Sequence, residues 1–229
     1  MPAVSETSVT AAADTPRGAD DVPASQDGRL TRAARTRAAV VDALLTLNEK
    51  GNLRPTARDI AAEAGVSLRS LYVHFDDLEA LMVAAAERHT QRLAALLPPL
   101  QVEGGIDERL EAFLARRFTL HEVGGGVRRA AVLQEPFSPT LQQAMAKGRK
   151  AGRAEIRQAF APEIEAAGPD LGSRLVRALE VATSSATWEA LRVHQQVPVE
   201  EATDQVRQMA LAFLAWWGSP ARDDGPPGR

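Results

Sequence analysis

Residues 56–81 hold hydrogen-bond donors at helical spacing beside a narrow apolar stripe. The donors and stacking groups are Arg69, Ser70, Tyr72 and His74, and they fall mostly on one side of a short segment. An arginine can donate two parallel hydrogen bonds to guanine O6 and N7, and hydroxyl groups can bind phosphate oxygens. The chemistry that these residue types favour is binding to double-stranded DNA.

Two short helices have to position these side chains. Thr56 precedes Asp59 by three residues, which is the spacing of a capping box and predicts a helix start. Gly65 stands where a helix ends on a left-handed residue. Ser67 can cap the next helix, whose apolar residues recur every three or four positions on the side away from the donors. The segment therefore predicts a helix-turn-helix.

The motif A-x-x-A-G-V-S-x-R-S-L-Y-x-H-F, followed by an acidic residue and E-A-L, resembles the DNA-binding motif of the TetR/AcrR family of transcriptional regulators. The resemblance covers about Leu30 to Leu81. It implies an all-α fold with a three-helix head and a helical body for ligand binding and dimerisation, about nine helices in all. Many relatives carry a lysine three residues after the His-Phe pair, where Leu78 stands here, so we expect a shallow salt dependence of DNA binding.

The expected DNA contacts combine side-chain chemistry with the resemblance. Arg69 is the predicted base reader, and the resemblance implies that Tyr72 and His74 bind phosphate. For Arg32 and Arg35, at the entry to the first helix, phosphate contact and a solvated basic face both remain open. The full set of predicted contacts is Arg32, Arg35, Thr56, Ser67, Leu68, Arg69, Ser70, Tyr72 and His74.

Composition limits the class of protein. The 229-residue chain has no cysteine, which excludes a disulfide framework and a thiol nucleophile. Its formal net charge is −3, but residues 29–76 carry eight basic and five acidic side chains, a net +3 that suits a DNA-binding head. No run of eighteen apolar residues and no secretory signal is present, so we expect a cytoplasmic protein without a membrane span. No cofactor or metal is expected.

The chain divides into four predicted parts. Residues 1–28 and 218–229 are predicted to be disordered tails, residues 29–76 the DNA-binding domain and residues 77–217 the body. The first helix is expected from about Thr31, and a fourth helix is expected to link head and body. A glycine loop, Gly124 to Gly126, is expected to separate two helices. Later helices are predicted over about 107–122, 128–134, 140–160, 170–195 and 198–217.

The resemblance implies two sites in the body. The last two helices would form a four-helix interface in a homodimer, and a small, largely apolar effector would bind within the body and release the DNA. For each ligand candidate a core role is at least as good an interpretation. The candidate interface residues are Leu175, Leu179, Ala182, Ala186, Val206, Met209, Phe213 and Trp217. The candidate ligand residues are Phe113, Phe118, His121, Phe137, Met145 and Trp188.

These observations favour a ligand-responsive, sequence-specific DNA-binding regulator, most simply a repressor on an inverted-repeat operator. An enzyme is disfavoured because the histidines lack metal-ligand spacing and no nucleophile-elbow or P-loop motif is present. The alternative is a helical interaction module or small-molecule-binding protein that has lost specific DNA binding, for which Leu78 is the argument.

Overall fold

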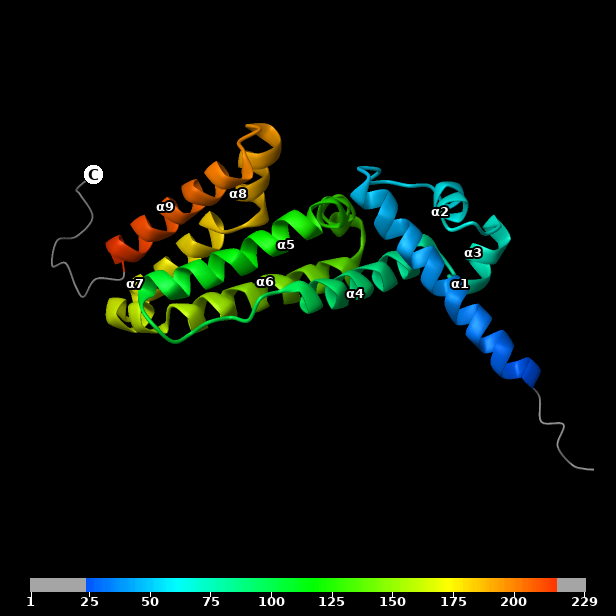
Figure 1. The fold of residues 1–229 in the computed structure, drawn as a ribbon, viewed down its shortest axis with the longest axis horizontal. Coiled ribbons are helices and arrows are strands. Elements are labelled where there is room, and N and C mark those ends of the chain that lie inside the picture. The colour runs from blue at the N-terminus through cyan, green and yellow to red at the C-terminus, as the bar shows by residue number, and fades with distance from the viewer. Residues whose placement is uncertain (1–23, 218–229) are drawn as a thin grey trace, which may run out of the picture.

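The computed structural model describes residues 24–217, with side chains from Thr31 onward. Within this range every regular element is helical, which confirms the predicted all-α fold. Figure 1 shows an elongated molecule with a small helical head at one end and a longer helical body at the other. The predicted tails lie outside the described residues, except for residues 24–28, which already belong to the first helix. None of the described helices is long and apolar enough to cross a membrane.

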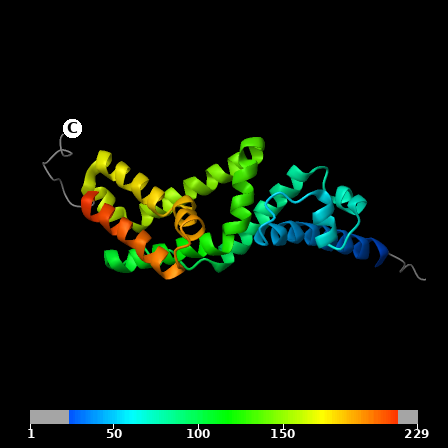
Figure 2. The ribbon, with the colours of Figure 1, turned by 90° about the horizontal axis from the view of Figure 1, so that it is seen from above.

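The head consists of α1 (Ala24–Glu49), α2 (Ala57–Glu63) and α3 (Leu68–His74). α1 begins before the expected start at Thr31, and its first turns extend past the other head helices in two perpendicular views (Figures 1 and 2). Apolar side chains from all three helices meet in one buried cluster, which accounts for their packing. Its largest members from the head are Val40, Leu44, Leu45, Ile60, Leu71 and Phe75.

Helix α4 (Leu78–Leu96) connects the head to the body. Its first half contributes Leu81 and Ala85 to the apolar cluster of the head. Further along, Arg88 donates hydrogen bonds to both carboxylate oxygens of Asp42 on α1, at 2.9 Å for the Nη2–Oδ2 pair. Arg92 lies 2.7 Å from the same carboxylate, so α1 and α4 are joined by polar as well as apolar contacts.

Helix α5 (Ile106–Gln134) runs without a break through the glycine run, so the predicted loop at Gly124 to Gly126 is wrong. A β-carbon at Gly126 would lie 2.5 Å from the carbonyl oxygen of Asn48 and 2.9 Å from the Cα of Glu49. The end of α1 therefore packs directly on the backbone of α5. Glycine is required here for close helix approach rather than for a turn.

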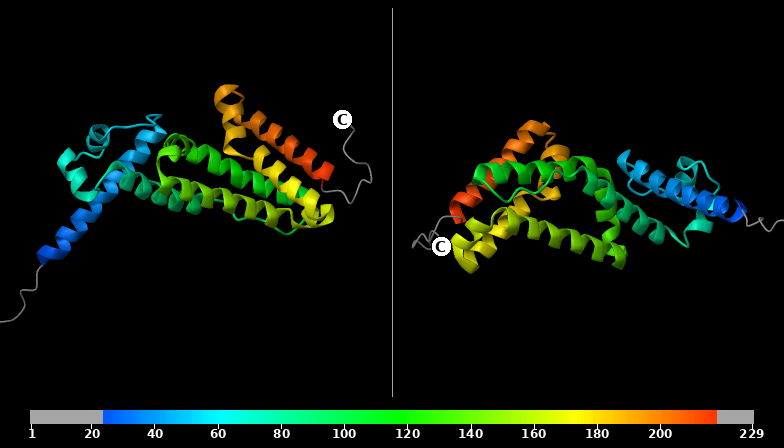
Figure 3. Two further views of the ribbon diagram at one scale, coloured as in Figure 1. Left: turned by 180° about the vertical axis from the view of Figure 1, so that it is seen from behind. Right: turned by 60° about the horizontal axis from the view of Figure 1, so that its bottom comes forward.

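The rest of the body is α6 (Pro139–Ala159), α7 (Ala161–Ala182), the short α8 (Ser185–Glu189), a π-helical turn η2 (Ala190–His194) and α9 (Val199–Trp217). Figure 3 shows α7 and α9 side by side at the far end of the body in both of its views. The single helix predicted over 170–195 is wrong. α7 starts at Ala161, bends at Gly168 with φ +75°, and ends at Ala182, after which Ser184 caps α8.

A second apolar cluster fills the body. Phe113 of α5 meets Phe160, between α6 and α7, edge to face with ring centroids 5.3 Å apart. Beside this cluster Arg109 is buried, and its Nη1 lies 3.0 Å from Oε2 of Glu163. The body thus contains an ion pair that was not expected from the sequence.

Candidate nucleic-acid interface

The buried face of α3 fixes its position on the head. Leu71 is fully buried and Phe75, which follows the helix, is 3% exposed. The guanidinium of Arg37 on α1 lies 4.7 Å from the centre of the Phe75 ring, close enough for a cation–π contact. These contacts orient α3 so that its opposite face points to solvent.

That outer face presents Arg69, Tyr72 and Val73, all exposed and spaced by three or four residues. Tyr72 is 49% exposed, and the side chains of Ser70 and His74, four residues apart on one flank of the face, are half-buried. The major groove of B-DNA is wide enough to admit an α-helix with such an exposed face. Among the described residues no carboxylate forms an ion pair with Arg69.

The helix starts carry the predicted caps. The Ser67 hydroxyl accepts a hydrogen bond from the Ser70 N–H at 3.1 Å, and Leu68, half-buried, opens α3. At α2 the Thr56 hydroxyl donates to Asp59 at 2.8 Å and accepts from the Asp59 N–H at 3.2 Å. Hydrogen bonds from the backbone N–H and the hydroxyl of Thr56 lower the pKa of Asp59. Thr56 therefore has no free hydroxyl proton for a phosphate, and the adjacent carboxylate would repel one.

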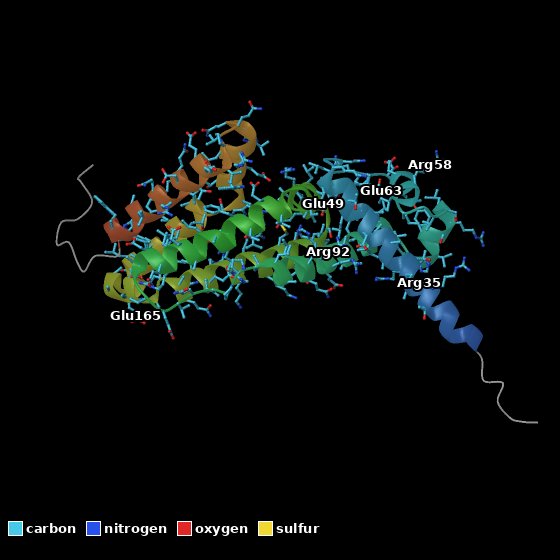
Figure 4. The ribbon with its side chains drawn as sticks, in the orientation of Figure 1. Arg35, Glu49, Arg58, Glu63, Arg92 and Glu165 are labelled. Carbon is cyan, nitrogen blue, oxygen red and sulfur yellow. The ribbon has the colours of Figure 1, made fainter. Side chains whose placement is uncertain are left out.

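Basic side chains surround this face. Arg32 and Arg35 are both exposed on α1, and Arg35 donates a long hydrogen bond to the Thr31 carbonyl at 3.4 Å. Figure 4 places Arg35 and Arg58, which is exposed on α2, at the head end of the molecule, while Glu165 lies at the opposite end. Their positive charge is available to neutralise phosphates.

Val73 was missed in the sequence analysis. Its side chain is 72% exposed in the middle of α3, so it contributes little to the core of the head. An apolar contact of this kind can recognise the methyl group of thymine. The spacing of four residues from Arg69 was the signal, since it places both side chains on one face.

Comparison with known proteins agrees with this geometry. Residues 41–85 match the family model described as bacterial regulatory proteins, tetR family. This chain is a TetR-family regulator with a DNA-binding domain. The match covers the end of α1, the helix-turn-helix and the first half of α4. These elements position the exposed face of α3 that carries Arg69, Tyr72 and Val73.

The fold of the whole regulator is also shared with solved structures. A transcriptional regulator from Rhodococcus sp. Rha1 superposes with a TM-score of 0.63 at 18% identity, over 82% of this chain and 99% of that one. The multidrug binding protein EbrR, complexed with imidazole, superposes with a TM-score of 0.51 at 23% identity, over 82% of this chain and 98% of that one. No curated protein matches the regulator significantly in sequence.

The predicted ligand residues of the regulator do not line one apolar cavity. Phe113 is 1% exposed in the body core, Phe137 is 73% exposed on the surface, and Met145 is half-buried on α6. Phe118 stacks on Trp188 with ring centroids 4.7 Å apart. His121 and Trp188 both line a larger cavity.

That cavity, which we call the joint pocket, has a volume of about 280 Å³. It lies between the end of α1, the middle of α5, and α8 with η2. Its wall is rich in charge. The charged residues that line it are Glu49, Glu122, Arg128, Arg129, Glu189 and Arg192.

His121 makes the stability of the regulator depend on pH. Burial lowers the pKa of His121 to about 4, against a hydrogen bond to the Thr183 carbonyl, 3.0 Å away, that favours the charged ring. Between about pH 6.5 and 4 the unfolded chain binds a proton that the folded chain does not, so stability falls as the pH falls through this window. The total loss should be about 3 kcal/mol.

Urea unfolding of the wild type and His121→Gln at pH 7 and pH 4.5 measures this effect. Glutamine can still donate to Thr183 but does not titrate, so the variant should lose distinctly less stability on acidification. Equal losses in the two proteins would show that another group is responsible.

The predicted dimer residues separate into two groups. Leu175, Leu179, Ala182 and Val206 are at most 3% exposed within a single chain, where α7 packs on α9. Within the single chain this stripe therefore contributes to the core of the body. Ala186 is exposed on α8, and Met209, Phe213 and Trp217 are half-buried on α9.

Proposed function

We propose that this regulator binds an inverted-repeat operator as a homodimer, with α3 of each copy in the major groove. The observation that carries the proposal is the exposed face of Arg69, Tyr72 and Val73, held outward by the buried Leu71. Arg69 reads a guanine, Val73 contacts a thymine methyl, and Tyr72 and the α1 arginines contact phosphates. Residues 29–76 form the DNA-binding domain, and residues 77–217 form the body, with α4 shared between the two cores.

A dimer is supported by the size of the head. One seven-residue recognition helix contacts only a few base pairs, and a two-fold pair reads two half-sites about 34–36 Å apart or somewhat wider. The outer side of α7 and α9 offers apolar surface for pairing, with Val181 67% exposed and Trp216 56% exposed. Phe213 and Trp217, stacked 5.3 Å apart, lie on the same helix as Trp216. We place the interface on this outer side.

The same proposal includes a small-molecule effector and repression in the cytoplasm. A dimer across a promoter excludes polymerase, and a ligand that favours a different spacing of the two heads releases the DNA. A fold shared with a multidrug binding protein supports such a ligand response. The joint pocket, which touches both head and body, supports it further.

Selection of bound DNA from a random duplex pool at near-physiological salt tests the proposal. Enrichment of one inverted repeat is the expected result. Recovery of a pool without enrichment would instead favour the alternative of a small-molecule-binding or interaction protein without specific DNA binding.

Tyr72→Phe removes one phosphate contact without changing the shape of the face. The variant should bind the selected duplex and a scrambled duplex more weakly by the same factor, about 2- to 10-fold, because a neutral hydrogen bond contributes about 0.5–1.5 kcal/mol. Fluorescence anisotropy with both duplexes measures the two affinities. A loss confined to the selected duplex would assign Tyr72 to base reading.

A further inference from the structure

The joint pocket contains an arginine without a counter-ion. Arg128 donates its Nε–H to the Ser185 hydroxyl, and no carboxylate of the described residues lies within 4 Å of its guanidinium. Its neighbours are paired: Arg129 lies 3.8 Å from Glu189, and Arg192 lies 3.4 Å from Glu122. The two terminal nitrogens of Arg128 are thus the unpaired cationic donors in this pocket.

The paired residues hold the pocket in shape around Arg128. The Trp188 indole N–H donates to Glu122 at 2.6 Å, and Trp188 itself is 3% exposed and stacked on Phe118. Glu122 is therefore directed toward Trp188 and Arg192, both of which donate to its Oε1. Burial lowers the pKa of Arg128 even though the more distant carboxylates of Glu189 and Glu135 attract its charge, so an anion bound in direct contact would relieve the remaining cost.

Size and lining indicate the rest of the ligand. A volume of about 280 Å³ exceeds what an inorganic ion fills, and Val123 and Val193 supply apolar surface beside the charges. We propose that the joint pocket binds a small organic carboxylate, whose charged group accepts two hydrogen bonds from Arg128 and whose apolar part lies against the two valines. A planar guanidinium binds carboxylate in this two-pronged way.

The position of the pocket connects its occupancy to DNA binding; this step rests on the proposed function. Glu49, at the end of α1, forms part of the wall, and Gly126 of α5 brings the backbone of Asn48 into direct contact with the body. Figure 4 shows Glu49 where the head meets the body. A carboxylate at Arg128 places negative charge beside Glu49, repels it, and shifts the end of α1 on α5. The head then turns relative to the body.

Calorimetric titration of the full chain with benzoate tests the site without reference to DNA. Benzoate should bind, whereas benzamide, which has the same shape without the charge, and inorganic phosphate, which lacks the apolar part, should not. Arg128→Gln should weaken benzoate binding at least about tenfold, as expected for a charge-assisted pair. Arg177→Gln, an exposed arginine on α7 outside the pocket, should leave it unchanged. No binding of benzoate to the wild type, or equal binding to Arg128→Gln, would overturn the proposal.

A second variant keeps the site testable if Arg128→Gln does not fold. Val193 is 51% exposed, so Val193→Trp can fill the pocket mouth without disturbing the core, and it should also weaken benzoate binding. The regulatory step is tested separately by operator affinity with and without benzoate. Benzoate that binds but leaves operator affinity unchanged would overturn the coupling alone. Absence of any selected operator would overturn the proposed function and leave the calorimetric result standing.

Discussion

Leu71→Ala is expected to lower the free energy of unfolding by about 2–5 kcal/mol, the range for truncating a fully buried leucine. Leu71 is 0% exposed at the centre of the head, where α1 and α3 meet. The lost side chain leaves a cavity beneath the recognition face, so the variant should also fail to bind operator at concentrations that saturate the wild type. Urea unfolding followed by circular dichroism measures the stability change.

Val73→Ala is the matched control for Leu71→Ala. It removes apolar atoms from the same helix, but from a side chain that is 72% exposed. Its stability should change by no more than about 0.5 kcal/mol. Its only expected defect is weaker discrimination at the base pair that carries the thymine methyl. Similar destabilisation by both changes would contradict the assignment of inner and outer faces of α3.

Glu163→Ala is expected to destabilise the body by about 3–5 kcal/mol, because it leaves the buried charge of Arg109 without a counter-ion. Arg109 is 5% exposed, and Glu163 on α7 is its carboxylate partner; Arg109 also donates to the Ala159 carbonyl at the end of α6. The pair therefore holds α5 to the junction of α6 and α7. Glu165→Ala, an exposed acid two residues away, should have almost no effect.

The Arg109–Glu163 ion pair should also make the stability of the protein depend on pH in acid. Burial opposes ionisation of Glu163, but hydrogen bonds from Arg109 and from its own backbone N–H outweigh burial and lower the pKa of Glu163. A lowered pKa in the folded state stabilises the protein above the unfolded value of about 4.3, and that stabilisation is lost as the pH falls through the folded pKa. Below pH 4 the gap in stability between the wild type and Glu163→Ala should therefore narrow. A gap that is constant with pH would mean that packing rather than charge is lost.

The helix-turn-helix could be predicted because its signals are local. The capping box of Thr56 and Asp59, the positive φ of Gly65 and the Ser67 cap all act within a few residues, and the structure has each of them. The face of α3 also follows from spacing alone, although Val73 was overlooked there.

Features of the body depend on contacts distant in sequence. The glycine run was interpreted as a loop because its reason, the backbone of Asn48 against Gly126, lies in another helix. The stripe of Leu175 and Leu179 was correctly identified as a buried face, but spacing does not tell whether α9 of the same chain or a second copy covers it. The joint pocket is lined by residues of α1, α5, α8 and η2, which are far apart in the sequence. No local sequence pattern therefore predicts its charged wall.

Base reading by Arg69 is tested by the ratio of affinities for the selected duplex and a scrambled duplex, measured for the wild type and Arg69→Ala. Arg69 is exposed on the outer face of α3, and a bidentate contact with guanine contributes about 1–3 kcal/mol of discrimination. We expect Arg69→Ala to lower this ratio by about 5- to 150-fold for each half-site, with little change in affinity for the scrambled duplex. An equal loss of affinity for both duplexes would contradict it, because Arg69 would then be a phosphate contact and sequence would be read elsewhere.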